Sequence, residues 1–307
     1  MVLASAALFG LSVPLSKILL GGVQPVFLAG LLYFGAFLGL TALWMAGAAG
    51  KGRKAAIARG DMKWLSLVIL FGGVLGPVLL LLGLSQTSGF AASLFLNLEG
   101  VATALVASAI FREFTGRRFW AALACMTVAG VLLTWDPTGS GFSLSGPSLI
   151  VLAMLCWGLD NNFTGKITGM EPVEIARAKC LAAGLINIGI GLFFGGKLAL
   201  GAVLLYALLV GTFSYGVSIV LFIHALRGWG AARTGAFFSV APFVGAAASV
   251  LLLNESMGWN MLPAFALMAV GAWLIVSEKH VHWHFHGKKY HAHEHFHDEG
   301  HHHKHEG

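Results

Sequence analysis

Ten hydrophobic stretches, each about as long as a bilayer-spanning helix, occupy almost the whole chain from Met1 to Ser277. A stretch of roughly 20 apolar residues crosses the hydrocarbon core as an α-helix. Lipid offers the backbone no hydrogen-bond partners, and a helix satisfies its own backbone groups. The sequence therefore predicts an all-α integral membrane protein that has the lipid bilayer as its first partner. We expect the helices at 1–20, 26–47, 64–83, 90–111, 118–135, 147–165, 172–194, 200–223, 233–253 and 258–277.

The composition agrees with this fold class. Hydrophobic residues make up 57% of the chain and charged residues 10%, whereas a soluble domain carries about 25% charged residues. The net charge of +6 does not indicate nucleic-acid binding, because the basic residues lie in short connections between the hydrophobic stretches. The cysteines, Cys125, Cys156 and Cys180, all fall inside apolar stretches, so no disulfide framework is expected.

The connections between the stretches alternate in charge. Lys197 is the one basic residue in the odd-numbered connections, when the residues inside span ends are set aside. Basic residues gather in cytoplasmic loops of membrane proteins, so this alternation predicts that both termini are cytoplasmic. The basic residues of the even-numbered connections and their edges are Lys51, Arg53, Lys54, Arg59, Lys63, Arg112, Arg117, Arg118, Lys166, Arg227 and Arg233.

The two halves of the chain match when one is shifted by 142 residues. Glu113 then pairs with Glu255, and Gly116 with Gly258. Each half holds five spans, and an odd number turns the second half upside down in the membrane. Inverted repeats of this kind place a substrate site between the halves, near the midplane. We therefore expect two inverted five-helix repeats, at 1–135 and 147–277, around a central cavity, followed by a tail at 278–307.

Three short motifs carry a family resemblance over about residues 1–277. They are Phe9, Gly10, Ser12, Pro14 and Lys17 in the first span, Leu98-Glu99-Gly100-Val101 followed by Arg112-Glu113, and Ala241-Pro242-Phe243 followed by Asn254-Glu255. With these motifs the chain resembles the EamA-type ten-helix members of the drug/metabolite transporter superfamily. The resemblance implies a ten-helix bundle that alternates its access, moves small organic solutes, often outward, and lies in a bacterial inner membrane. Gly100 departs from the family pattern, which usually has proline there.

Glu99 is the strongest candidate for a transport residue. It lies near the middle of the fourth span, where an ionisable residue costs roughly 2.5 kcal/mol or more. Such a residue should face a cavity or a partner, either as a proton-coupling or substrate-contacting group or as a carboxylate that ties two helices together. Thr103 shares its helix face one turn later, and Asn97 could line the same cavity or hydrogen-bond between helices.

Matching polar clusters in the first and sixth spans provide further candidates. Ser12, Ser16 and Lys17 lie in the first span, and Asp160 and Asn161 in the sixth. We interpret the clusters as a pair of pseudo-symmetric gates or rims of the cavity. The alternative for a lysine is that it extends to the membrane interface and has no role in transport.

An aromatic residue in the sixth span is a further candidate. Trp157 could stack on a substrate, or it could pack in the core or against lipid.

The tail is rich in histidine. Neutral imidazole ligates zinc, nickel, cobalt and copper, so we expect the tail to bind such ions, and its few apolar residues predict disorder without metal. The histidines are His280, His282, His284, His286, His291, His293, His295, His297, His301, His302, His303 and His305.

These patterns favour a secondary transporter that exports a small organic metabolite or drug-like solute and requires no cofactor. The alternative is a divalent-metal efflux protein that uses the tail as metal collector or sensor. An enzyme is not expected, because the connections are short and hold no nucleophile–base set. The sequence leaves the substrate and the oligomeric state open.

Overall fold

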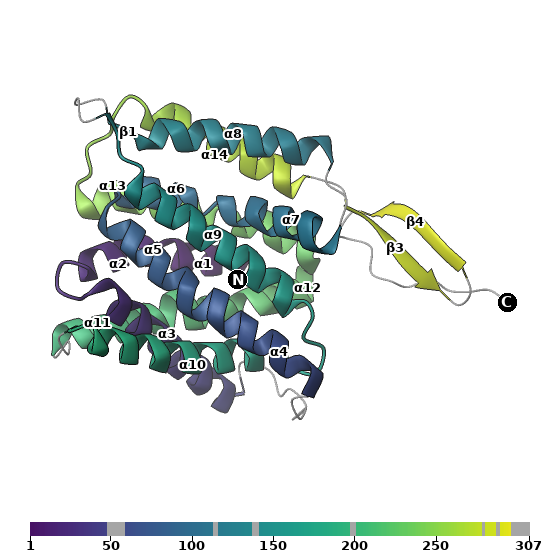
Figure 1. Ribbon diagram of the computed structural model, residues 1–307, viewed down its shortest axis with the longest axis horizontal. Helices are drawn as coiled ribbons and strands as arrows, with labels where there is room; N and C mark the ends of the chain where they lie inside the picture. Colours follow the sequence, from purple (N-terminus) through teal and green to yellow (C-terminus); the bar gives the residue numbers. More distant parts are fainter. Residues whose placement is uncertain are drawn as a thin grey trace.

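The computed structural model describes residues 1–47, 59–112, 116–136, 141–196, 201–277, 280–286 and 289–295. Up to Ser277 these residues form ten helical rods (Figure 1). The first five are α1 (Val2–Gly10) with α2 (Ser12–Leu19); α3 (Pro25–Met45); α4 (Arg59–Val68) with the π-helical segment η1 (Ile69–Leu75) and α5 (Gly76–Ser85); α6 (Gly89–Phe95) with α7 (Leu98–Phe111); and α8 (Arg117–Thr134). The second five are α9 (Ser145–Thr164); α10 (Pro172–Phe193); α11 (Ala202–Val210) with η2 (Gly211–Val217) and the part of α12 (Ser218–Phe238) before Gly230; the part of α12 after Gly230 with α13 (Ala241–Leu253); and α14 (Met261–Val276). α12 is kinked at Gly230, whose backbone is not helical (φ 79°).

The lengths of these rods suit a bilayer. Within the described residues, eight helical stretches are long and apolar enough to cross a membrane, and α14 is a shorter apolar helix of 16 residues. α9 has 20 residues, and the polar run 160–162 lowers its hydropathy. The prediction of an all-helical membrane protein with ten helices is confirmed.

Backbone irregularities recur at the same places in the two halves. The π segments η1 and η2 start 142 residues apart, at Ile69 and Gly211. The left-handed residues that end α7 and α13 are Arg112 (φ 57°) and Asn254 (φ 51°), also 142 residues apart. The helical bond pattern breaks after Phe95 in the first half and after Phe238 in the second. These irregularities have no hydropathy signal, so their shared spacing is independent evidence for the predicted repeat.

Corresponding rods run antiparallel, as an inverted repeat requires. Glu255, at the C-terminal end of α13, accepts a hydrogen bond from the backbone N–H of Gly89 at the start of α6. α6 and α13 accordingly meet at one end of the bundle (Figure 1). In the α8–α14 pair, Arg118 at the start of α8 donates to the carbonyl of Ser277 after α14. Asn260 at the start of α14 donates to the carbonyls of Leu132 and Trp135 at the end of α8.

Glycine permits two close helix crossings that bring the site together. A Cβ atom on Gly10 in α1 would lie 2.3 Å from the carbonyl oxygen of Ala241 in α13. A Cβ on Gly158 in α9 would lie 2.7 Å from the carbonyl carbon of Ala102 in α7. The first span of each half therefore contacts the fourth span of the other half, backbone against backbone.

Two short hairpins complete the described chain. β1 (Trp135–Asp136) pairs with β2 (Gly141–Phe142) after α8. In the tail, β3 (His280–His286) pairs antiparallel with β4 (Lys289–His295). The hairpin projects from the end of the bundle opposite the α6–α13 contact (Figure 1). That the tail is disordered without metal stays a prediction.

Candidate functional site

A cavity of about 210 Å³ lies at the centre of the bundle. Helices from both halves contribute to its wall, which combines three charged residues with a larger group of aromatic ones. The charged residues are Glu99, Asp160 and Lys179, and the aromatic residues are Phe9, Tyr33, Trp157, Tyr215, Phe222 and Phe238. We call this the central cavity.

An ion pair occupies one wall of the central cavity. The Lys179 Nζ atom of α10 lies 2.6 Å from Oδ2 of Asp160 in α9, and Thr164 donates to the other carboxylate oxygen at 3.3 Å. A Cβ at position 72 would fall 2.1 Å from the Asp160 carboxylate, so a glycine there makes room for the pair. The side chains of Lys179 and Asp160 are 19% and 7% exposed. Most of the charge of Asp160 is therefore neutralised within the protein.

Glu99 belongs to a second polar network, between α7 and α9. Its Oε1 atom accepts a hydrogen bond of 2.9 Å from the side-chain amide of Asn161, and the same amide donates to the Thr103 hydroxyl at 3.1 Å. Thr103 in turn donates to the backbone carbonyl of Glu99. The Glu99 carboxylate thus accepts a hydrogen bond from a neutral amide, whereas the Asp160 carboxylate is bonded to a cation.

The π segment η1 supplies a third element of the wall. The backbone carbonyl of Gly72 accepts hydrogen bonds from the Tyr33 hydroxyl at 2.7 Å and from Nε1 of Trp157 at 3.1 Å. The next carbonyl, of Gly73, accepts a hydrogen bond from Asn187. π segments disturb the regular helical hydrogen bonds and are frequent at functional sites. Here the disturbed carbonyls fix two aromatic rings that face the central cavity.

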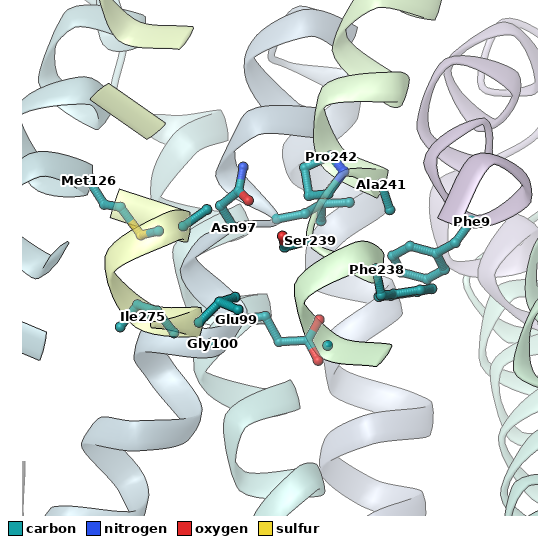
Figure 2. Close-up of a pocket in the computed structure, with 14 residues that line it drawn as sticks. Phe9, Asn97, Glu99, Gly100, Met126, Phe238, Ser239, Ala241, Pro242 and Ile275 are labelled. Carbon is teal, nitrogen blue, oxygen red and sulfur yellow. The ribbon is translucent and has the colours of Figure 1, made fainter. Parts of the chain in front are cut away.

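A neighbouring pocket of about 220 Å³ shares Phe9, Glu99 and Phe238 with the central cavity. It lies where both broken rods change direction, so Asn97 and Ser239, which are 142 residues apart, both line it. Figure 2 shows the Glu99 carboxylate pointing toward the helical segment that carries Phe238 and Ser239. Glu99 therefore lines both the central cavity and the neighbouring pocket.

Comparison with known proteins decides the family. The model of the EamA-like transporter family matches residues 1–135 and 144–277. The chain belongs to the EamA-like transporter family. The resemblance found in the sequence is thereby confirmed, and the protein is a membrane transporter with multiple spans and not an enzyme.

Individual relatives agree with this assignment. An uncharacterized transporter of Methanothermobacter thermautotrophicus is 29% identical over 271 residues, which cover 83% of this chain and 78% of that protein. An uncharacterized protein of Pseudomonas aeruginosa is 30% identical over 155 residues, covering 50% of this chain and 53% of that protein. A solved crystal structure, described only as that of a protein, aligns with a TM-score of 0.60 at 17% identity and covers 89% of this chain and 94% of its own. This last likeness concerns the fold alone.

The structure brings most of the sequence-predicted candidates of this EamA protein together. Glu99, Trp157, Asp160 and Asn161 line the central cavity, and Thr103 bonds to two of them. Asn97 lines the neighbouring pocket and also donates to the carbonyl of Leu94 in its own helix. The Trp157 ring nitrogen is engaged with the Gly72 carbonyl, so its ring is held in the wall.

The candidates of the first span lie elsewhere. Ser12 is buried and interacts with Tyr215 of the central cavity. Ser16 is buried with no hydrogen-bond partner for its hydroxyl. Lys17 points to the end of the bundle where α5 stops, and donates to the carbonyls of Leu84 and Thr87. Lys17 thus contacts the backbone of another rod, and its expected role at a rim of the cavity stays a prediction.

Sequence reasoning missed several residues of the central cavity, among them Lys179, Tyr33 and Cys180. Lys179 lies near the start of a predicted span, where a lysine usually extends to the membrane interface, yet it is in the third turn of α10 and reaches inward to Asp160. Tyr33 and Cys180 gave no signal, because an aromatic residue or a cysteine in an apolar span is ordinary. The depth of Lys179, seven residues after Pro172, was the one available clue.

The metal site expected in the tail falls only partly within the described residues. Seven of the tail histidines fall in β3 and β4, where the backbone pairing is described, and the others, His297, His301, His302, His303 and His305, lie outside the described residues. Within the described residues, no group of three or more His, Cys, Asp or Glu could hold a metal ion. Metal binding by the tail stays a prediction.

Proposed function

We propose that this EamA protein is a secondary transporter that exports a small organic solute from the cytoplasm across a bacterial inner membrane. Glu99 would couple protons to solute movement. The single observation that carries the proposal is a carboxylate, bonded to an amide and not to a cation, in a central cavity that both halves build. Intramembrane ionisable residues of this kind mark substrate and proton pathways.

The chemistry of the cavity wall supports an organic solute. Aromatic rings form a continuous set in which Phe9 contacts Tyr215 and Phe238, and Tyr33 contacts Tyr215. Ligand sites for small organic molecules combine apolar and aromatic walls with a few placed polar groups. Glu99, Asn161 and the Asp160–Lys179 pair are those groups here.

The alternative, efflux of a divalent metal, draws its support from the tail histidines. The central cavity gives it little support. Lys179 neutralises Asp160, and a cation in contact with a carboxylate competes with a metal ion for it. A metal pathway would also call for more ligands in one place than Glu99 and Asp160 provide.

Vesicle assays with a charge-neutral variant test the proposal. Purified protein is reconstituted with a pH dye in the lumen, and a panel of amines, amino acids and organic acids, together with Zn²⁺ and Ni²⁺, is added in turn. We expect at least one organic solute to move protons in the wild type. Glu99→Gln should abolish the pH change and retain exchange of labelled solute, because the amide keeps the shape and cannot ionise.

Glu174→Gln is the matched control. Glu174 lies in the first turn of α10 and lines neither cavity, so its removal should leave proton flux unchanged. Proton flux in Glu99→Gln equal to that of the wild type would remove Glu99 from the mechanism. Metal-driven flux without any organic substrate would favour the alternative.

A further inference from the structure

A connection of three residues, 86–88, joins α5 to α6 at the end of the bundle where α6 meets α13. Two charged side chains from other rods hold this connection from its two sides. The Lys17 Nζ atom of α2 donates to the carbonyl oxygens of Leu84 at 2.6 Å and Thr87 at 2.8 Å. The Glu255 carboxylate, after α13, accepts hydrogen bonds from the backbone N–H groups of Gly89 at 2.5 Å and Phe90 at 2.9 Å.

These contacts match the needs of the backbone they touch. The last carbonyls of one helical rod and the first N–H groups of the next have no partners within their own helices. A cation stabilises the unpaired carbonyls at the end of a helix, and an anion stabilises the unpaired N–H groups at the start of one. Hydrogen bonds to charged groups contribute more than neutral ones. Lys17 comes from the first half of the chain and Glu255 from the second, so together they fasten the α5–α6 connection to both repeats.

The α5–α6 connection and α6 lie between the central cavity and a second cavity. On the outer side of the connection lies a cavity of about 440 Å³, lined by Thr87, Ser88, Ser256 and Asn260 among others. None of the residues that line it also lines the central cavity. Between the two spaces, Ala92, Ser93 and Leu94 of α6 are fully buried.

Between the two spaces, α1, α6 and α13 pack closely, with a glycine at each close contact. A Cβ on Gly245 of α13 would lie 2.6 Å from the carbonyl oxygen of Gly10 and 2.9 Å from the Ser93 hydroxyl. A Cβ on Gly89 would lie 2.8 Å from the Ser249 hydroxyl. Backbone atoms and the side chains of Ser93, Ser249 and Leu253 fill the space between α1, α6 and α13 at these points. A solute can pass here only when α6 moves away from α13, and that movement must break the Glu255 contacts.

We infer that Lys17 and Glu255 form a gate that holds the central cavity closed at the α5–α6 end. The inference rests on the proposed transport function, since a transporter must open this end in one of its states. Lys17 and Glu255 are positioning residues: they contact the backbone of the connection and not the solute. Releasing either charge shifts the protein toward the state that is open at this end.

Cys180 provides a reporter, because it lines the central cavity and is buried. In a background with Cys125→Ala and Cys156→Ala, it is the one thiol of the chain. A membrane-impermeant methanethiosulfonate reagent is added to one face of oriented proteoliposomes and then, separately, to the other. The rate of Cys180 labelling from each face is measured by mass spectrometry, with no solute required.

We expect Glu255→Gln and Lys17→Met to raise labelling from the α5–α6 face by about tenfold, since each removes charge-assisted hydrogen bonds. Labelling from the opposite face should fall in the same variants. Lys17→Arg keeps the cation and its donors and should label like the background. Gln86→Ala is the matched control within the connection, because Gln86 is exposed and donates only to Leu82 in its own helix; it too should label like the background.

Three outcomes would overturn the gate: equal labelling from the α5–α6 face in the background and both variants, an equal rise from both faces with a lowered melting temperature, or labelling in Lys17→Arg as fast as in Lys17→Met. The second would identify a merely structural role. A one-sided rise in labelling, in a protein that moves no organic solute, would contradict the proposed substrate and uphold the gate.

Discussion

At the scale of single residues, the two carboxylates of the central cavity differ in their bonding partners. Asp160 is paired with a lysine at 2.6 Å, while Glu99 is bonded to the amide of Asn161. The pair links α9 to α10, whereas the hydrogen bond between Asn161 and Glu99 links α9 to α7. The two acidic residues of the wall therefore have different partners, one a cation and the other a neutral amide.

The ion pair leads to a prediction about stability. Removing one partner of a buried pair leaves an uncompensated charge and costs roughly 3–5 kcal/mol. We expect Lys179→Met and Asp160→Asn each to lower the melting temperature in detergent markedly. The double variant should be more stable than the sum of the two losses predicts, because no lone charge remains. Additive losses in this double-mutant cycle would show that the two side chains are not coupled.

At the scale of helices, the sequence predicted the rods well and their interruptions poorly. Spans follow from hydropathy, so the predicted 26–47 and 172–194 correspond to α3 and α10. The break in the fourth span lies after Phe95, where the sequence analysis predicted no interruption. A π segment needs no special residue, and the partners that stabilise η1, Tyr33 and Trp157, lie on other rods. Tertiary contacts decide such features, and one-dimensional patterns do not contain them.

The crossing of α7 and α9 at Gly158 gives an element-scale prediction. Gly158→Ala would press a methyl group into the backbone of Ala102, and overpacking of this kind typically costs about 1–3 kcal/mol. The helices should separate, and the Asn161–Glu99 hydrogen bond should lengthen. Reduced thermal stability together with impaired proton-coupled transport is the expected result.

A second glycine serves as the control for that change. A Cβ on Gly189, in the middle of α10, would meet no atom within 4 Å. Replacing an unhindered helical glycine by alanine stabilises by up to about 1 kcal/mol, so Gly189→Ala should be neutral or stabilising. If both variants behave alike, close approach at Gly158 is not the cause.

At the scale of the whole molecule, orientation in the membrane follows from charge and not from the fold. The helices would make the same backbone hydrogen bonds in either orientation across the membrane. The basic residues in the even-numbered connections favour cytoplasmic termini. A reporter fused after Ser277 should be active only in its cytoplasmic form. Activity of a periplasmic reporter at that position would reverse the orientation proposed for the transporter.

The tail gives a second prediction at this scale. Deletion of residues 278–307 removes no membrane rod, so the bundle should stay folded and should transport its organic solute without metal. The isolated tail should bind Ni²⁺ or Zn²⁺, and binding should weaken below a pH of about 6.5, where imidazoles become protonated. Calorimetry on the peptide and transport by the truncated protein measure the two parts. Loss of host metal resistance on truncation, with solute binding intact, would favour metal efflux.

The paired π segments have one more consequence, which concerns the phase of the helices that contain them. An α-helix advances 100° per residue, and a π segment accommodates one residue more in a turn, so the faces before and after η1 are out of step by about that angle. The same slip occurs at η2. Deleting one residue from either segment would restore regular winding and turn everything beyond it away from its present neighbours. We therefore expect both halves of the transporter to retain the extra residue in their π segments. Losing it in one half alone would set the inverted repeats out of register with each other.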